Sequence, residues 1–232
     1  PKSYTLPKTN LTPNSPKPLL HYKNTFLTKT GHVDAALAYD TFARNGWDVQ
    51  WVTTYGRTQK AHYHPATHEV MVVLSGPGTI RWGVSDLDPY MQEHARDELD
   101  PKEKGNGGFE MQVQVGDCFV IPAGVAHKSF DDAAASLEPT CLTGGGAHRI
   151  EAEDPRGFVA ALQVEGFTMM GAYPRGFTWG WAEGGEHVGD FESVWGVENP
   201  QLDPVCGGKG GIGAFWEGCD GVDQPVAGKA GE

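Results

Sequence analysis

Two histidines and a glutamate occur close together in residues 56–76, at spacings that suit a metal site. His62 and His64 are two residues apart, so on a β-strand both imidazoles point to the same face. Pro65 favours a turn directly after them, and Glu69 opens the next strand-like run. If the chain reverses at Pro65, Glu69 returns to the face that carries the two histidines. The spacing therefore predicts three ligand side chains on one face of a hairpin.

A fourth candidate ligand lies in residues 116–131. There a Pro-Ala-Gly turn precedes His127, which begins a strand that could return to the same cavity. Three neutral imidazoles and one carboxylate suit a divalent transition metal, namely Fe, Mn, Ni, Co, Cu or Zn, whereas calcium and magnesium prefer more oxygen ligands. An octahedral ion would keep open positions for water, dioxygen or an oxygen atom of a substrate.

These histidines also have a plainer explanation, as solvated loop residues or hydrogen-bonded core groups. A lone histidine is usually one or the other. Four candidate ligands in two segments bounded by Gly and Pro form a more specific pattern, and that pattern favours the metal site.

The surrounding sequence predicts a β-rich fold that would position these segments. Several short, strand-like runs, in which the residue pattern repeats every two positions, are bounded by Gly or Pro. They are WDVQWVTTYG, HEVMVVLSG, GTIRWGV, EMQVQVG, DCFVIPAG, FVAALQV and FTMMGAYP. Together they favour an all-β sandwich or barrel. One short helix is predicted over residues 33–44, where good helix formers precede Asn45 and Gly46.

The two ligand-bearing segments resemble the two sequence motifs of the cupins. Residues 56–76 fit the first motif, G(X)5HXH(X)3–4E(X)6G, at every fixed position. Residues 116–131 fit the second, G(X)5PXG(X)2H(X)3N, except that Asp131 stands in place of the final Asn. The resemblance implies a double-stranded β-helix, the jelly-roll barrel of the cupins, with one mononuclear metal site. It also implies that the ligands are His62, His64, Glu69 and His127, and the Asn position is not a ligand in the family.

A wider likeness covers most of the chain. It looks like the YjlB-type single-domain cupins of bacteria and fungi in the segments PNSPKPLLHYK, HYHPATHEVMVVLSG, PAGVAHKSF, MMGAYPRG and LDPVCGGKGG. This likeness implies the fold and the ligand set, and it leaves the substrate open.

Composition divides the chain into three parts. Residues 1–45 are predicted to form an N-terminal arm and the helix, residues 46–178 the cupin barrel, and residues 179–232 a Gly- and Trp-rich extension packed on the barrel. The Pro-rich arm is expected either to form an edge strand or to cross to a second subunit. A charged excursion over residues 85–108 is expected at the surface, with a helical turn at residues 92–99.

The overall composition argues against nucleic-acid and membrane partners. The chain has 232 residues and a formal net charge of −12, whereas nucleic acids and anionic membranes attract clustered Lys and Arg. No apolar run is long enough to span a bilayer. The four cysteines form no CxxC pair, which predicts free thiols and a reducing, cytoplasmic setting.

Lys60 is the candidate catalytic residue. It shares strand parity with His62 and His64, which predicts a side chain that points into the barrel. There it would bind an anionic substrate or act as an acid or base. The alternative is a lysine at the barrel mouth whose ammonium group reaches solvent. His68, directly before Glu69, is expected to face away from the site.

The remaining aromatic and histidine residues are given structural roles. Core or pocket-wall positions are predicted for Trp51, Trp82, Phe119, Phe158 and Phe167. Surface positions are expected for His148 and His187, which have no partner at a useful spacing.

The ligand set favours a metal-dependent enzyme that acts on a small organic molecule. The leading hypothesis is an oxidoreductase of the oxidase or dioxygenase type, in which the metal holds dioxygen beside the oxygen of a phenol or enolisable carbonyl compound. A redox-neutral isomerase, decarboxylase or lyase would use the same ligands, and so would a small-molecule-binding protein without catalysis. Because cupins commonly pair through arms and sheet edges, the resemblance also implies a homodimer.

Overall fold

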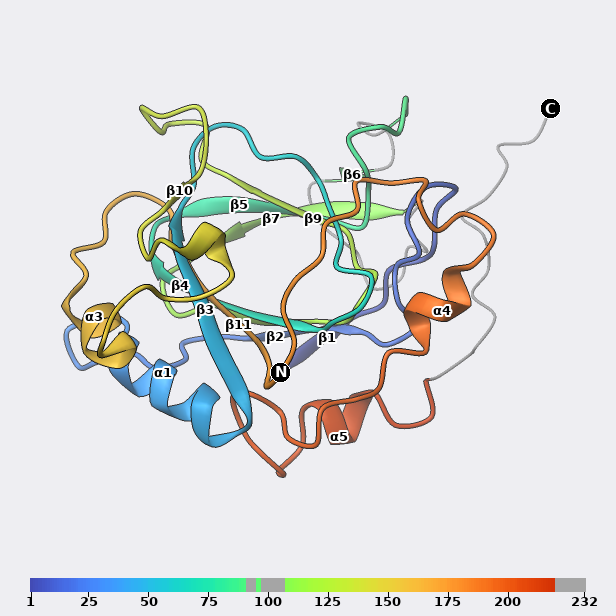
Figure 1. Cartoon of the computed structure of the whole chain (residues 1–232). Coiled ribbons are helices and arrows are strands. Elements are labelled where there is room, and N and C mark those ends of the chain that lie inside the picture. The colour runs from blue at the N-terminus through green and yellow to red at the C-terminus, as the bar shows by residue number, and fades with distance from the viewer. Residues whose placement is uncertain (91–94, 97–106, 220–232) are drawn as a thin grey trace.

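The computed structural model describes residues 1–90, 95–96 and 107–219, which form two facing β-sheets with short helices outside them (Figure 1). The strands are β1 (Lys2–Tyr4), β2 (Leu19–Tyr22), β3 (Trp47–Thr54), β4 (Glu69–Ser75), β5 (Gly78–Trp82), β6 (Ala95–Arg96), β7 (Gly108–Val113), β8 (Cys118–Ile121), β9 (His127–Phe130), β10 (Thr140–Cys141) and β11 (Thr168–Pro174). The helices are α1 (Ala35–Arg44), the 3-10 turn η1 (Gly145–Ala147), α3 (Pro155–Ala161), α4 (Phe191–Trp195) and α5 (Ile212–Phe215).

One sheet has seven strands in the order β1-β2-β8-β4-β11-β3-β10, and the other has four in the order β6-β7-β5-β9. All pairings are antiparallel except that of β6 with β7. The order departs strongly from the order of the strands in the chain, as a jelly roll requires. The predicted all-β jelly-roll fold is confirmed.

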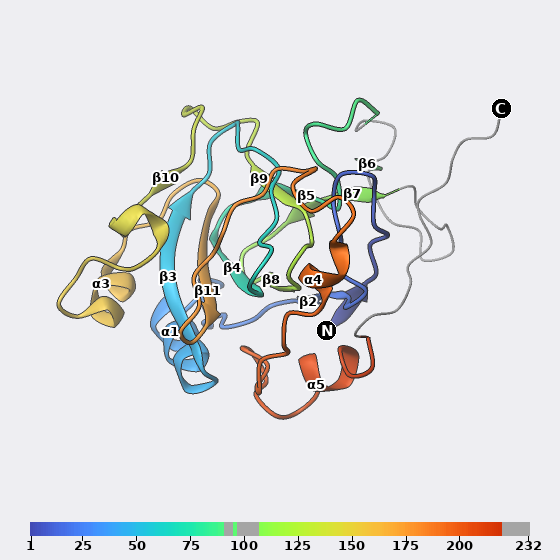
Figure 2. The same cartoon turned by 45° about the vertical axis from the view of Figure 1, so that its right-hand side comes forward.

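Both faces of the seven-stranded sheet are buried. Inward side chains such as Trp51 and Met71 meet Ile80 and Trp82 of the smaller sheet and form the barrel core. The opposite face forms a second core with α1, α3 and α5, which lie outside this sheet in both views (Figure 1, Figure 2). A strand that is covered on both faces reads as a continuous apolar run, which explains the sequence EVMVVLS of β4.

Helix α1 confirms the predicted short helix, and it begins two residues later than expected. The side chain of Asp34 accepts a hydrogen bond from the backbone N–H of Leu37 at 2.9 Å, so Asp34 is the N-cap. The helix ends at Arg44, and Gly46 follows with a φ of 82°, the left-handed conformation that glycine adopts at little cost.

The prediction of a strand for FVAALQV is wrong, because most of this segment lies in α3. Asp154 accepts a hydrogen bond from the N–H of Gly157 at 3.0 Å, and Pro155 occupies the first helical turn. The helix buries Val159 and leaves Phe158 39% exposed, so the predicted core position of Phe158 is also wrong. The other four aromatic residues predicted to be buried, namely Trp51, Trp82, Phe119 and Phe167, are buried.

The two ends of the described chain both contact the sheets. Strands β1 and β2 of the N-terminal arm form one edge of the seven-stranded sheet, so the arm lies along the body of its own chain. Residues beyond 178 supply α4 and α5, and Trp216 is buried in the second core. The division into three parts at residues 45 and 178 stays a prediction, and the helical turn predicted at residues 92–99 lies outside the described residues.

All four cysteines are free thiols, as predicted, and Cys118 is fully buried in β8. Among the described helices, none combines the length and the apolar character that crossing a membrane would require.

Candidate metal centre

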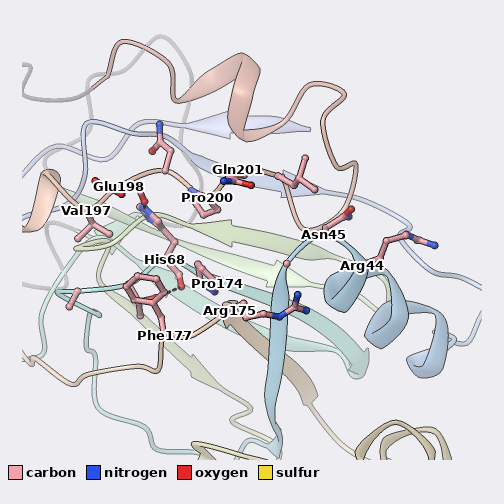
Figure 3. A pocket seen from close by; sticks show the side chains of 15 residues that line it. Arg44, Asn45, His68, Pro174, Arg175, Phe177, Val197, Glu198, Pro200 and Gln201 are labelled. Atoms are coloured by element: carbon pink, nitrogen blue, oxygen red, sulfur yellow. Dashed lines mark hydrogen bonds between the residues drawn. The ribbon is translucent and has the colours of Figure 1, made fainter.

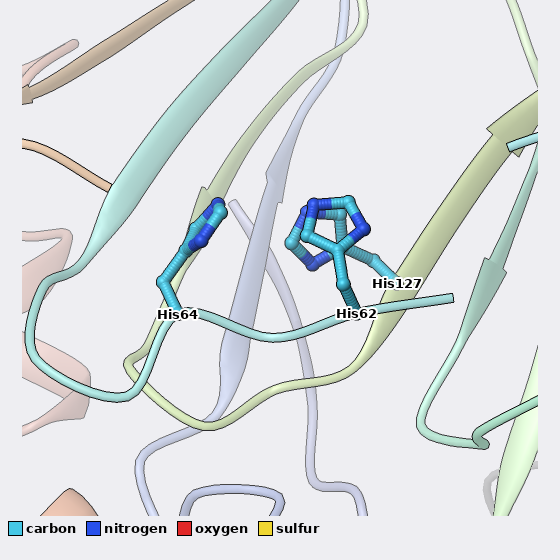
Figure 4. Close-up of side chains that lie close together, drawn as sticks. All are labelled: His62, His64 and His127. Carbon is cyan, nitrogen blue, oxygen red and sulfur yellow. The ribbon is translucent and has the colours of Figure 1, made fainter. Parts of the chain in front are cut away.

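Three imidazoles converge where the segment before β4 crosses the start of β9. His62 and His127 are paired through their backbones, with N–H···O distances of 3.0 and 2.8 Å in the two directions. His64 follows two residues after His62, and Figure 4 shows the three side chains close together. One possible ligand nitrogen from each of the three rings lies within 4.8 Å of the others, and all three residues are buried.

Each of the three rings is held through Nδ1 by a backbone carbonyl oxygen. The acceptors are the carbonyls of Lys60 for His62 at 3.0 Å, Gly180 for His64 at 2.5 Å and Val125 for His127 at 3.1 Å. Because a carbonyl oxygen only accepts, Nδ1 must carry the proton in each ring. A neutral imidazole with its proton on Nδ1 has its lone pair on Nε2, the atom left to bind a metal.

Glu69, the first residue of β4, completes the cluster. Its Oε2 atom lies 3.3 Å from Nε2 of His64 and 3.2 Å from Nε2 of His127. Two ligands at right angles on one ion, each bound at about 2.1 Å, would be about 3 Å apart. The separations of Glu69 from His64 and His127 therefore suit ligands of a single ion.

The other oxygen of Glu69 is held by a hydrogen-bonded chain. The Tyr173 hydroxyl on β11 donates to Oε1 of Glu69, and Nε1 of Trp51 on β3 donates to the Tyr173 oxygen at 3.0 Å. This chain orients the carboxylate so that Oε2 faces the histidines. Gly171 makes room for it, because a Cβ at that position would overlap the Trp51 ring.

The electrostatics of the cluster favour a neutral imidazole at His62 and an ionised carboxylate at Glu69. Burial lowers the pKa of His62 well below its usual value, and the neighbouring His127 and His64 lower it further. Burial alone would raise the pKa of Glu69, but His64 and His127 outweigh it and hold this pKa far below its usual range. Burial and the charge of Glu69 raise the pKa values of the Tyr173 and Tyr55 hydroxyls, which keeps both phenols protonated.

Unsatisfied buried atoms are a second sign that the four side chains fit a transition metal. Nε2 of His64 and Oε2 of Glu69 are buried atoms that make no hydrogen bond of acceptable geometry within the described residues. Leaving such atoms unsatisfied is costly, and a bound cation would satisfy both. The group of three nitrogens and one oxygen is the mixture preferred by first-row transition metals.

A segment of the C-terminal extension, residues 179–183, covers the site, and we call it the tryptophan strap. It pairs with the His62–His64 segment through Tyr63 and Ala182, with N–H···O distances of 2.8 and 3.1 Å. The Trp181 ring stacks on His62 with a centroid separation of 3.6 Å and an interplanar angle of 8°. The strap thus supplies the acceptor for His64 and shields His62 from solvent.

Lys60 does not point into the barrel, contrary to the parity argument. Its Nζ forms an ion pair with Glu183 at 2.9 Å, and the Lys60 side chain is 69% exposed. Strand β3 ends at Thr54, so strand parity does not extend to residue 60. The contribution of Lys60 to the site is its backbone carbonyl, which accepts from His62. Its catalytic role stays a prediction.

His68 faces away from the metal cluster, as expected, and is buried. Its Nδ1 accepts from the N–H of Ala123 at 2.9 Å, and its Nε2 lies 3.1 Å from the carbonyl of Glu198. This side of the loop opens into a separate pocket of about 440 Å³ whose lining includes His68, Arg175 and Phe177 and none of the four candidate ligands (Figure 3).

The two loop histidines contact aromatic residues. His148 is exposed, as expected, and its ring stacks on Trp179 with a centroid separation of 4.0 Å. His187 is bonded through Nδ1 to the Tyr63 hydroxyl at 2.8 Å and therefore braces the residue between His62 and His64.

Sequence reasoning did not find Tyr173 or Gly180 as parts of the site. Tyr173 stands in the MMGAYP run, where strand periodicity marks it only as a core residue. Gly180 acts through its carbonyl oxygen, for which side-chain type gives no signal.

Comparisons with known proteins were made for the whole chain. The family model described as Cupin matches residues 23–134. A Bacillus subtilis (strain 168) protein, YjlB, is 25% identical over 218 residues, which cover 93% of this chain and 96% of that protein.

Two solved structures align with part of the chain. Oxalate decarboxylase of Lactobacillus farciminis, in a formate complex, aligns with 56% of this chain at 12% identity and a TM-score of 0.28. RmlC of Streptococcus suis, in complex with dTDP-D-xylose, aligns with 72% at 10% identity and a TM-score of 0.31. The matched region spans 26% of the decarboxylase chain and 63% of the RmlC chain.

Proposed function

Since the chain belongs to the cupin superfamily, we propose that His62, His64, His127 and Glu69 hold one divalent transition metal, and that the loaded protein is an enzyme acting on a small organic molecule. The observation that carries the proposal is the arrangement of the three imidazoles. Each is bound through Nδ1 to a carbonyl, which leaves Nε2 of each ring for a metal, and Oε2 of Glu69 lies beside Nε2 of His64 and of His127.

For the reaction we favour dioxygen-dependent oxidation of a phenolic or enolisable molecule. A bound ion of Fe, Mn, Ni, Co or Cu would supply Lewis acidity and electron transfer to dioxygen, whereas Zn would supply Lewis acidity alone. Three neutral imidazoles and a single carboxylate leave a divalent site with positive charge, so the site attracts an anionic oxygen atom. Trp181 over His62 limits the access of bulk water to this charge.

A redox-neutral isomerisation, decarboxylation or lyase reaction would use the same four side chains. In that case the positive site would stabilise an enolate, and no dioxygen would be consumed. A protein that binds a small molecule without turning it over is the third reading.

The deciding experiment is elemental analysis of freshly purified protein, followed by an assay chosen by the metal found. Near-stoichiometric Fe, Cu, Ni, Co or Mn, with oxygen uptake in the presence of phenols or enolisable ketones, is the expected result. Zinc with anaerobic turnover would replace the oxidative reaction by the redox-neutral one. Absence of metal after purification and after reconstitution with each of the six ions would refute the metal site itself.

We also propose that Lys60 acts at the mouth of the site, and that the protein is a homodimer. The Lys60 ammonium group is exposed beside the strap, where it could attract an anionic substrate before entry. Strand β1 forms an open edge of the seven-stranded sheet and could pair with a second copy. Light scattering that gives the mass of a monomer would refute the dimer.

A further inference from the structure

We infer that Trp82 and Ser129 form a binding site for one anionic oxygen of the substrate, so that the substrate is a small carboxylate, enolate or phenolate. This inference rests on the proposed function, because the two residues lie beside the proposed metal ligands. They are in the small sheet, on the side of the barrel opposite Glu69 and Tyr173.

The strand register places both residues next to His127. Trp82 of β5 is directly opposite His127 of β9, and paired residues of antiparallel strands share a face of the sheet. The ring centroids of Trp82 and His127 are 6.0 Å apart. Ser129 follows His127 by two residues and so points to the same, inward face.

Trp82 differs from every other tryptophan of the chain in its hydrogen bonding. All seven tryptophans lie in the described residues, and the other six indole N–H groups each have an acceptor; those six are Trp47, Trp51, Trp179, Trp181, Trp195 and Trp216. Nε1 of Trp82 is buried and has no acceptor within the described residues, although the residue is 0% exposed. An indole N–H only donates, so what it lacks is an acceptor atom.

Ser129 adds a second unsatisfied group. Its Oγ is buried beside the Tyr55 hydroxyl and makes no hydrogen bond of acceptable geometry within the described part of the chain, and the residue is 1% exposed. Its backbone is fixed, because its N–H donates to Oε1 of Gln59 at 2.6 Å. The backbone is therefore held in place, and the hydroxyl can turn its proton toward an oxygen atom of a ligand.

The kind of ligand atom that would accept from Trp82 and Ser129 follows from the groups around it. Two buried donors beside a positively charged centre are best satisfied by an oxygen with negative charge, because hydrogen bonds to charged groups are the stronger ones. Carboxylates, enolates and phenolates each carry such an oxygen on a small organic body. A neutral amide of the same shape offers a weaker acceptor and no net charge.

The test measures anion binding and stability in the same variants. Wild type, Trp82→Phe and Ser129→Ala are loaded with Co²⁺ and titrated with benzoate, 4-nitrophenolate and acetylacetonate, while the visible spectrum of the cobalt ion is followed. Benzamide serves as the neutral control. We expect at least one anion to bind the wild type and to bind each variant about tenfold more weakly or worse, with unchanged cobalt content.

The stability of the unliganded variants separates a binding role from a structural one. Within the described residues neither group makes a hydrogen bond of acceptable geometry, so we expect Ser129→Ala to keep the melting temperature close to that of the wild type. The matched control is Trp216→Phe, which removes the hydrogen bond to the carbonyl of Pro18 in the second core. It should lower the melting temperature and leave anion affinity unchanged.

The failures of the two proposals can be told apart. Cobalt that binds while no anion changes its spectrum, or anion affinities that are equal in wild type and both variants, would overturn this inference alone and leave ordered water as the partner of the two donors. Absence of cobalt binding in the wild type would overturn the proposed function and this inference together.

Discussion

The phenolic hydroxyl of Tyr173 donates a hydrogen bond to Oε1 of Glu69, and this contact decides which oxygen of the carboxylate faces the three histidines. Trp51 donates in turn to the Tyr173 oxygen at 3.0 Å, so the hydroxyl proton is directed at Glu69. A carboxylate held in this way presents one oxygen, Oε2, to an ion. The preorganisation of the site therefore depends on two residues that are not ligands themselves.

Tyr173→Phe is expected to weaken metal binding while leaving the fold intact. Loss of a group that orients a ligand typically lowers metal affinity about ten- to a hundredfold. Competition with a chromophoric chelator measures the affinity. Tyr90→Phe, on an exposed turn, is the matched control and should bind as the wild type does. Equal affinities for both variants would show that the Tyr173 contact does not position Glu69.

Removal of the metal is expected to lower thermal stability through the histidine cluster. A ligand that binds only the folded state stabilises it by about 4 kcal/mol when present at a thousand times its dissociation constant. Calorimetry of the wild type before and after chelation should show this difference. The double variant with His62→Ala and His64→Ala should show none, whereas His32→Ala, at an exposed position, should behave as the wild type.

The stability of the metal-free protein is expected to fall as the pH is lowered from 7 to 4. Burial, His127 and His64 depress the pKa of His62 below its usual 6.5, so the unfolded chain takes up a proton at a higher pH than the folded chain does. The depressed pKa of Glu69 acts in the same direction, since its contribution is present above its usual 4.5 and is lost as pH falls further.

Urea unfolding at several pH values measures this dependence. The double variant lacking His62 and His64 should show a smaller slope of unfolding free energy against pH. A slope as steep as that of the wild type would assign the dependence to groups outside the cluster.

Gly171→Ala is expected to destabilise the protein and to disturb the site at the same time. The added Cβ would overlap the Trp51 ring, and overpacking of a core typically costs about 1–3 kcal/mol. Displacement of Trp51 would also loosen Tyr173, so metal affinity should fall with stability. The control is Gly213→Ala in α5, where a Cβ meets nothing within 4 Å and alanine favours the helix. Chemical unfolding of both variants checks the contrast.

Lys60→Met is expected to raise KM for an anionic substrate and to leave kcat nearly unchanged. The ammonium group is exposed and paired with Glu183, so we expect it to assist the encounter with an anion rather than to transfer a proton. Lys29→Met, at another exposed lysine, is the control. A large fall in kcat with unchanged KM would restore the acid–base role.

One sequence prediction failed, and one parity argument did not apply, because a local pattern was extended beyond its range. The run FVAALQV is too short for periodicity to distinguish a strand from a helix, and the capping pair Asp154 and Pro155 before it was the better signal. The parity of Lys60 with His62 would apply only within one strand, and residues 55–61 do not form one.

The sequence by itself determined the fold class and marked the four candidate ligands, because both depend on short-range patterns. A period of two defines the faces of strands, and Pro and Gly define the turns that bring His62, His64 and Glu69 to one face. Only the tertiary structure decided how these groups are held. The acceptor of His64 is 116 residues away at Gly180, and the donor to Glu69 is 104 residues away at Tyr173. Contacts over such distances arise from strand order and sheet packing, which no local spacing records.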